Sequence, residues 1–119
     1  MDIDAQKAET EETFARLSRR YILPDEVPLG LQFIPLDAPG DRDGFVKAAE
    51  ALGYEAIWFP GEDEEDQADG YLELERVISP ITFDEIWRHE SLLSEVALRY
   101  GFAADGWGFL IPLDEVDQA

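Results

Sequence analysis

Residues 71–109 read YLELERVISPITFDEIWRHESLLSEVALRYGFAADGWGF, and they decide the fold because they predict a strand, a helix and a second strand in succession. The first part, YLELERVIS, alternates: Leu72, Leu74 and Ile78 share one face, as in a half-buried strand. Tyr71, Glu73, Glu75 and Val77 share the other face. Ser79-Pro80 ends this strand, because proline cannot donate a hydrogen bond to a neighbouring strand.

The helix that follows has a clear start and a clear end. Thr82 and Glu85 form the T-x-x-E pattern of a capping box directly before an apolar run. Gly101 ends the helix, since glycine suits the left-handed conformation after a helix. One side of this helix carries Ile86, Leu93, Val96, Ala97 and Tyr100. The last strand is predicted over residues 102–111.

The preceding residues show the same alternation of element types. Residues 28–36, PLGLQFIPL, alternate as a strand. The next helix is expected to start near Asp41 or Asp43, and Gly53 marks its end. Residues 54–61, YEAIWFPG, predict a second strand directly after it. These three elements supply the first half of the predicted sheet.

The predicted order is β-α-β-β-α-β, preceded by an additional helix from Glu9 to Tyr21 with Thr10 as its cap. This order is typical of an α+β, ferredoxin-like sandwich. Right-handed crossovers then predict a four-stranded antiparallel sheet in the order 4-1-3-2, with both crossover helices on one face. The N-terminal helix should cover an edge or the open face. We expect one domain over residues 1–119, with a core from about 9 to 112 and frayed acidic termini.

The sequence D-G-W-G near the end of the last strand is unusual, because glycine weakens a strand interior. Asp105-Gly106 is a turn or bulge dipeptide, so the strand is expected to kink there. Gly108 is expected to leave space for the close approach of a backbone or a ring. Trp107 is then either a core aromatic between the sheet and the third helix, or a surface anchor for a partner.

The charge of the chain favours a basic partner. There are 28 acidic residues against 9 lysines and arginines, a formal net charge of −19. Such a field repels nucleic acid and anionic lipid and attracts basic proteins. Candidate partner-binding residues are Trp107, Asp105 and the acidic run Glu62, Asp63, Glu64, Glu65 and Asp66. The same run could instead be a solvated loop or collect divalent cations weakly, although it lacks the ligand order of a calcium loop.

Little in the sequence indicates an enzyme. There is no cysteine, which removes thiolate nucleophiles and thiolate metal sites and fits a reducing cytoplasm. The single histidine, His89, lies four residues after Glu85, and could be half of a metal site or a packed structural residue. There is no signal-peptide pattern, no apolar run long enough for a membrane span and no phosphate-binding loop. We therefore expect no cofactor and no metal.

Three stretches resemble one known family: EET at residues 11–13, FVKAAEALGYEA at residues 45–56 and YGFAADGWGF at residues 100–109. Together they resemble the RraB family, the regulators of ribonuclease E activity B, also called the ribonuclease E inhibitor family. The resemblance covers roughly residues 9–110. It implies a ferredoxin-like domain that binds the arginine-rich scaffold region of ribonuclease E and inhibits the enzyme without being catalytic itself. The long acidic tail of the best-known members is here only PLDEVDQA.

Two further hypotheses remain open on the residues alone. The chain could be an acidic adaptor, or an immunity-type inhibitor, of an unrelated basic enzyme. It could also be a small metal-dependent enzyme built around His89. The hypothesis that follows from the resemblance is a non-enzymatic protein-binding regulator of RNA degradation, and it also agrees with the charge.

Overall fold

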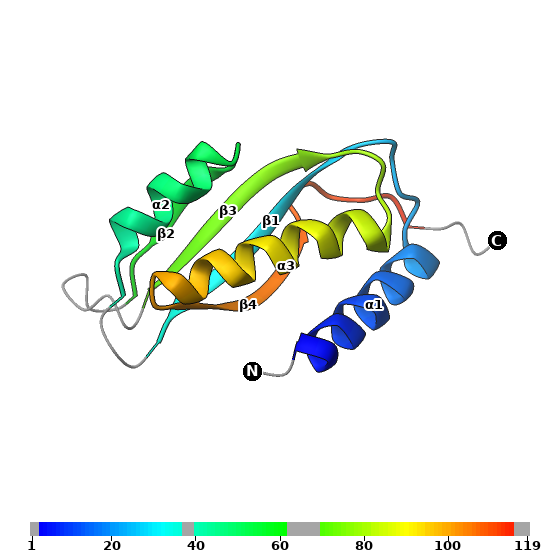
Figure 1. Ribbon diagram of the computed structural model, residues 1–119. Helices are drawn as coiled ribbons and strands as arrows, with labels where there is room; N and C mark the ends of the chain where they lie inside the picture. The colour runs from blue at the N-terminus through cyan, green and yellow to red at the C-terminus, as the bar shows by residue number, and fades with distance from the viewer. Residues whose placement is uncertain (1–2, 37–39, 62–69, 116–119) are drawn as a thin grey trace.

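The computed structural model describes residues 3–36, 40–61 and 70–115. Three helices and four strands follow one another (Figure 1): α1 (Ile3–Arg20), β1 (Val27–Pro35), α2 (Arg42–Ala51), β2 (Glu55–Phe59), β3 (Tyr71–Ile78), α3 (Phe83–Arg99) and β4 (Phe102–Phe109). The strands form one sheet in the order β2-β3-β1-β4, and every neighbouring pair is antiparallel. This is the predicted order 4-1-3-2, so the α+β, ferredoxin-like prediction with an additional N-terminal helix is confirmed.

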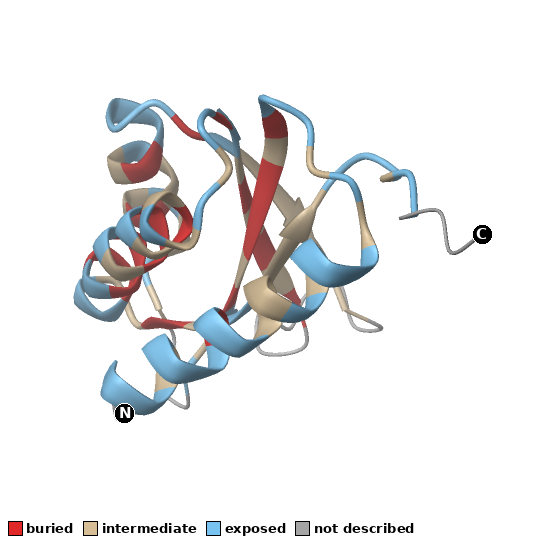
Figure 2. Ribbon diagram, turned by 90° about the vertical axis from the view of Figure 1, so that its right-hand side faces the viewer, coloured by how far each residue is buried: buried red, intermediate tan, exposed pale blue. Residues whose placement is uncertain are grey.

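The core lies between the sheet and the two crossover helices. Figure 2 shows α2 and α3 on the same side of the sheet, as predicted, with the buried residues facing them. Phe45 of α2 packs edge-on against Phe33 of β1, with ring centroids 5.3 Å apart, and lies 5.3 Å from the ring of Phe102. All three rings are fully buried. This aromatic cluster joins α2 to the neighbouring strands β1 and β4.

The helix starts agree with the capping signals in the sequence. The side chain of Asp41 accepts a hydrogen bond from the backbone N–H of Gly44 at 2.9 Å, and α2 follows it. Thr82 accepts from the backbone N–H of Glu85 at 3.2 Å at the start of α3. Gly101, with φ of 82°, follows α3 in the left-handed region, as expected for a helix end.

The prediction for the N-terminal helix was wrong in its start. Helix α1 begins at Ile3, and Thr10 lies inside the helix instead of capping it. Thr10 is buried, and its hydroxyl donates a hydrogen bond to the side chain of Glu90 on α3. Figures 1 and 2 show that α1 begins beside α3 and slants along the β4 edge of the sheet. Of the two predicted places for this helix, the structure shows the edge. Among the described residues, none of the helices has the length and apolar character of a membrane span.

The predicted kink at Asp105-Gly106 is confirmed as an irregularity in the pairing of β1 with β4. Gln32 pairs with Gly106 but Phe33 pairs with Ala104, so Asp105 is an additional residue in β4. Gly106 has φ of 143°, a conformation that other residues rarely adopt. Because side chains alternate along a strand, one additional residue moves all later side chains to the opposite face.

The bulge therefore determines which way Trp107 points. Trp107 pairs with Leu31 and Phe109 pairs with Leu29, and both leucines are buried on the helix-bearing face. Trp107 is half-buried and packs against the edge of the core. The core contact expected for Trp107 is thus present, and residues of α1 also line the space beside its ring.

The expected close approach at Gly108 is wrong. A Cβ atom at this position would meet nothing within 4 Å. The close approach occurs instead at Gly30, which pairs directly with Gly108. A Cβ atom at Gly30 would lie 2.7 Å from Cδ2 of Leu110. A Cβ atom would have open space at both glycines of D-G-W-G, but only Gly106 has a positive φ, so Gly106 is the one that the backbone requires.

Replacing these two glycines with alanine should separate their roles. We expect Gly106→Ala to lower the free energy of unfolding by about 1 kcal/mol or more, because alanine is strained at positive φ. We expect Gly108→Ala to leave it unchanged or slightly raised, since the added methyl group has space and an ordinary backbone. Urea unfolding followed by circular dichroism measures both values. Equal losses in the two variants would contradict the assignment of the strain to Gly106.

Candidate functional site

The candidate site is a groove between α1 and the bulged part of β4, with one side chain of α3 at its base. Its volume is about 410 Å³. We call it the α1–β4 groove and define it by Gln6, Glu9, Thr10, Glu90, Asp105 and Trp107. The groove brings together two of the predicted partner-binding residues, Asp105 and Trp107, with four others from two different helices.

Helical spacing on α1 and the bulge on β4 together build this groove. Gln6, Thr10 and Thr13 follow one another at intervals of four and three residues, so they lie on one face of α1. All three line the groove. On the opposite wall, the bulge leaves Asp105 exposed and turns Trp107 toward the helices. The edge of the sheet and the N-terminal helix thus enclose a common space.

Glu90 is a buried carboxyl group, because the residue is only 4% exposed. The hydroxyl of Thr10 donates to its Oε1 at 2.5 Å, and Nε2 of Gln6 donates to its Oε2 at 2.9 Å. Burial raises the pKa of Glu90, and the negative charge of Glu9 acts in the same direction. The hydrogen bonds from Gln6 and Thr10 oppose this shift.

The amide of Gln6 has a fixed orientation and an unused acceptor. Its Nε2 donates both to Glu90 and, at 3.0 Å, to Oγ of Ser94. A carboxylate only accepts, so the nitrogen of the amide must face Glu90. Its oxygen, Oε1, is buried and has no hydrogen-bond partner in the part of the chain that the structure describes. A buried acceptor without a donor is unfavourable, so this atom is suited to a ligand with N–H groups.

The groove presents acids and an aromatic ring. Glu9 and Asp105 are exposed at its rim, and Glu90 is at its base. The Trp107 ring forms one wall and is held edge-on by Phe109, with ring centroids 5.6 Å apart. No lysine, arginine or histidine lines this groove among the described residues. This combination is chemically suited to a cation with an extended hydrophobic stem.

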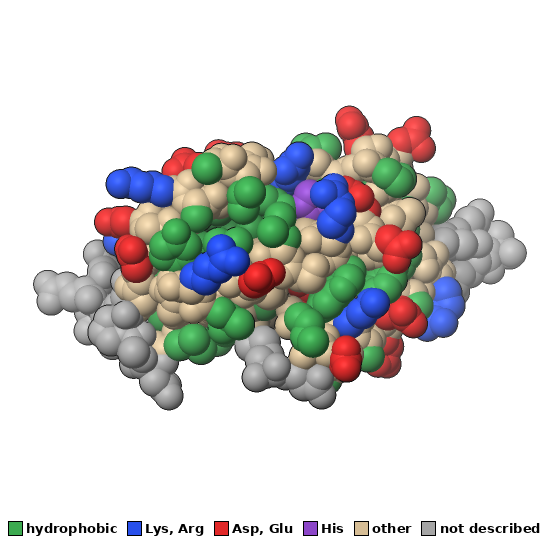
Figure 3. All heavy atoms as spheres, in the orientation of Figure 1, with side chains coloured by type: hydrophobic (Ala, Val, Ile, Leu, Met, Phe, Trp, Pro, Cys, Tyr) green, Lys and Arg blue, Asp and Glu red, His purple; other side chains and the backbone are tan. Residues whose placement is uncertain are grey.

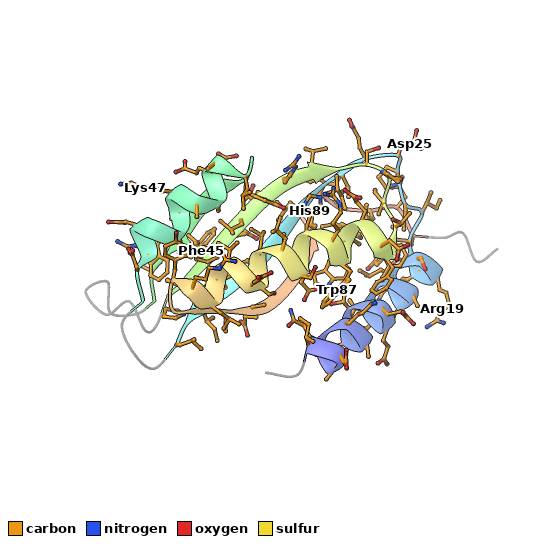
Figure 4. The ribbon with its side chains drawn as sticks, in the orientation of Figure 1. Arg19, Asp25, Phe45, Lys47, Trp87 and His89 are labelled. Carbon is orange, nitrogen blue, oxygen red and sulfur yellow. The ribbon has the colours of Figure 1, made fainter. Side chains whose placement is uncertain are left out.

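His89 lies on α3 (Figure 4), away from the groove. It is hydrogen-bonded to Tyr54 and contacts Glu85. It is 3% exposed, so the prediction of a packed histidine is confirmed. The Tyr54 hydroxyl is hydrogen-bonded to Nδ1, and Nε2 lies 3.1 Å from Oε1 of Glu85. A neutral ring with its proton on Nε2 satisfies both contacts, since Tyr54 then donates and Glu85 accepts. No group of three or more histidine, cysteine or acidic side chains in residues 3–36, 40–61 and 70–115 could hold a metal ion.

On the face formed by α1, α2 and α3, acidic, basic and hydrophobic side chains are intermixed (Figure 3). Two of the basic side chains on α3 are held by acids of the same helix. Arg88 lies 2.5 Å from Glu85, and Arg99 lies 3.3 Å from Glu95. The described side chains of this face therefore form no continuous basic patch of the kind that binds a phosphate backbone.

A scan against models of protein families matches residues 6–109 to the family described as regulator of ribonuclease activity B. The chain belongs to this family. A search of curated proteins found no match. Family membership supports a role in regulating ribonuclease activity, and is consistent with a protein that is not itself a catalyst. The RraB resemblance inferred from the three stretches at residues 11–13, 45–56 and 100–109 is thereby confirmed.

The remaining predicted partner-binding residues, the acidic run, are not described by the structure. Glu62, Asp63, Glu64, Glu65 and Asp66 lie outside the described residues. Sequence reasoning missed Gln6, Thr10 and Glu90. The signal for Glu90 was present, since it follows Ile86 by four residues and precedes Leu93 by three, within the apolar side of α3. An acid in such a position indicates a buried polar contact.

The His89 cluster predicts a loss of stability on mild acidification. Burial lowers the pKa of His89, and Arg88 and Arg76 add to the effect, while Glu85 opposes it. His89 is then protonated more readily in the unfolded chain than in the folded chain, so stability falls as pH decreases below about 6.5. We expect His89→Gln to show less of this loss in urea unfolding between pH 7.5 and pH 5.5.

Glu90 contributes to the pH dependence of stability in the opposite direction. Its pKa is raised in the folded chain, so its contribution to stability increases as the pH falls through that folded-state pKa. The contribution of His89 is therefore best measured in a Glu90→Gln background, with and without His89→Gln. An identical pH dependence in these two proteins would contradict a depressed His89 pKa.

Proposed function

We propose that this RraB-family protein is a non-enzymatic cytoplasmic regulator that binds a basic segment of a ribonuclease and so modulates RNA degradation. The partner that the family resemblance favours is the arginine-rich scaffold region of ribonuclease E. The observation that carries the proposal is the family match over residues 6–109 together with a net charge of −19. A field of this sign attracts a basic segment and repels RNA and anionic membranes.

The charge also supplies a mechanism of inhibition. Basic segments of RNA-processing enzymes hold RNA through its phosphates, with lysine and arginine replacing counterions. An acidic protein bound to such a segment occupies the same positive charges. RNA that depends on the segment for recruitment is then cleaved more slowly, whereas the catalytic centre itself is untouched.

This proposal predicts binding that depends strongly on salt. We expect the dissociation constant for a purified basic scaffold segment of ribonuclease E to rise by at least about tenfold between 50 and 300 mM salt, because screening shortens the range of the attraction to about one Debye length. Isothermal titration calorimetry measures this constant. The catalytic part of the ribonuclease, without the basic segment, is the control and should bind far more weakly.

Cleavage assays test the regulatory part. The protein should slow RNA cleavage by the full-length ribonuclease and leave cleavage by the catalytic part unchanged. Absence of binding to every part of the ribonuclease would overturn the proposal, and tight binding to an unrelated basic enzyme instead would favour the immunity-type alternative. Binding that is equally tight at both salt concentrations would contradict an electrostatic interface.

A further inference from the structure

We propose that the α1–β4 groove is a binding site for one arginine side chain of the partner, with the guanidinium group against Trp107 and its N–H groups directed to Gln6, Glu90 and Asp105. The inference rests on the proposed function for the identity of the partner. Its chemistry rests on the groove alone, and it can be tested with a small arginine derivative.

One side chain that lines the groove, Gln6, has an acceptor atom without a described partner, and this favours a ligand that donates hydrogen bonds. Oε1 of Gln6 is buried and has no partner among the described residues, and its orientation is fixed by the donors that face Glu90 and Ser94. A ligand that brings an N–H group to this oxygen removes the cost of leaving it unsatisfied. An anion or a hydrogen-bond acceptor would add a second unsatisfied group beside it.

The charges of the groove indicate that this donor is a cation. Glu9 and Asp105 lie at the rim, Glu90 lies at the base, and no basic residue among the described ones lines the groove. The arginines of α1 that could have reached into it instead lie near the other end of the helix. Arg16, Arg19 and Arg20 line a different depression, and Arg20 is 3.4 Å from Glu115. Within the part of the chain that the structure describes, these acids therefore have no cation in the groove, and a cationic ligand would supply one.

The wall of the groove favours arginine over lysine. The guanidinium group is planar and weakly hydrated, and it can stack on an aromatic ring while its edge donates several hydrogen bonds. Trp107 supplies the ring, and the acceptors lie on the other walls. The ring is held from one side by Phe109. A volume of about 410 Å³ admits the hydrophobic stem of the side chain together with its head group.

A second acidic surface on the molecule lacks these features. Glu55, Glu73 and Glu75 lie on the face of the sheet opposite α2 and α3, and Glu55 pairs directly with Glu75. Burial and the charges of the two neighbouring acids raise the pKa of Glu75. This surface has no described acceptor that is buried without a partner. It serves below as the competing location for a bound cation.

The test uses the full chain, labelled with nitrogen-15, and N-acetyl-arginine amide as the probe. The three tryptophans, Trp58, Trp87 and Trp107, give three indole N–H signals. The signal that is missing in a Trp107→Phe variant belongs to Trp107. We expect a saturable shift of the Trp107 signal, with the Trp58 and Trp87 signals nearly unchanged. N-acetyl-citrulline amide, which has the same shape without the charge, should give no saturable shift, and the lysine analogue should bind several-fold more weakly.

Charge-neutral variants locate the contacts. Glu90→Gln and Asp105→Asn should each weaken binding of the probe by roughly threefold to tenfold, the usual range for losing a charged hydrogen-bond partner in a partly solvated site. Glu50→Gln on the exposed side of α2 removes the same charge outside the groove and should change nothing. Thermal unfolding of each variant confirms that it is folded before the titration.

Three results would overturn the proposal: no saturable shift at Trp107, an equal shift with the citrulline probe, or saturable shifts confined to the backbone signals of Glu73 and Glu75. Failure of the proposed function is separate from these. If the Trp107 signal responds to the probe but no ribonuclease segment binds, the arginine site stands and the partner is wrong. If the segment binds with strong salt dependence and Trp107 does not respond to the probe, the site is wrong and the function stands.

Discussion

The additional residue in β4 sets the direction of the side chains that follow it in the strand. A regular strand would direct Ala104 and Gly106 toward the helices, and Trp107 and Phe109 would face away from them. Because Asp105 is unpaired in the register with β1, Trp107 and Phe109 instead share the face of Leu31 and Leu29. The same shift leaves the Asp105 carboxylate exposed beside the ring. One bulge thus joins an aromatic wall and an acid in a single site.

The second constraint is how α1 is held. Few apolar side chains of this helix reach the core, with Phe14 packed against its edge. The contacts of its first half are polar: Gln6 and Thr10 donate to Glu90, whose pKa is raised by burial. Satisfied polar contacts of this kind specify position more than they add stability. They place α1 opposite the bulge, and this placement forms the groove.

The sequence predicted the parts of the structure that local chemistry determines. Thr82 and Asp41 start helices, Gly101 follows one, and Asp105-Gly106 forms the irregularity, because each depends on neighbouring residues alone. The errors occurred where a partner distant in the chain decides. Thr10 has the chemistry of a cap, but Glu90, eighty residues away, takes its hydroxyl. Gly108 resembles a close-contact glycine, but Leu110 lies over Gly30 instead. For the same reason the groove, built from three elements, could be anticipated only at Asp105 and Trp107.

The net charge and the groove act at different distances. A charge of −19 attracts any basic molecule, so by itself it provides a fast encounter with little selectivity. Selectivity requires groups that are desolvated and specifically paired, because discrimination depends on what a wrong ligand leaves unsatisfied. Glu90 and the Oε1 atom of Gln6 have this property, since both are buried. In the proposed site, an arginine at the correct position donates hydrogen bonds to these groups. A basic chain without such an arginine interacts only with the exposed acids at the rim.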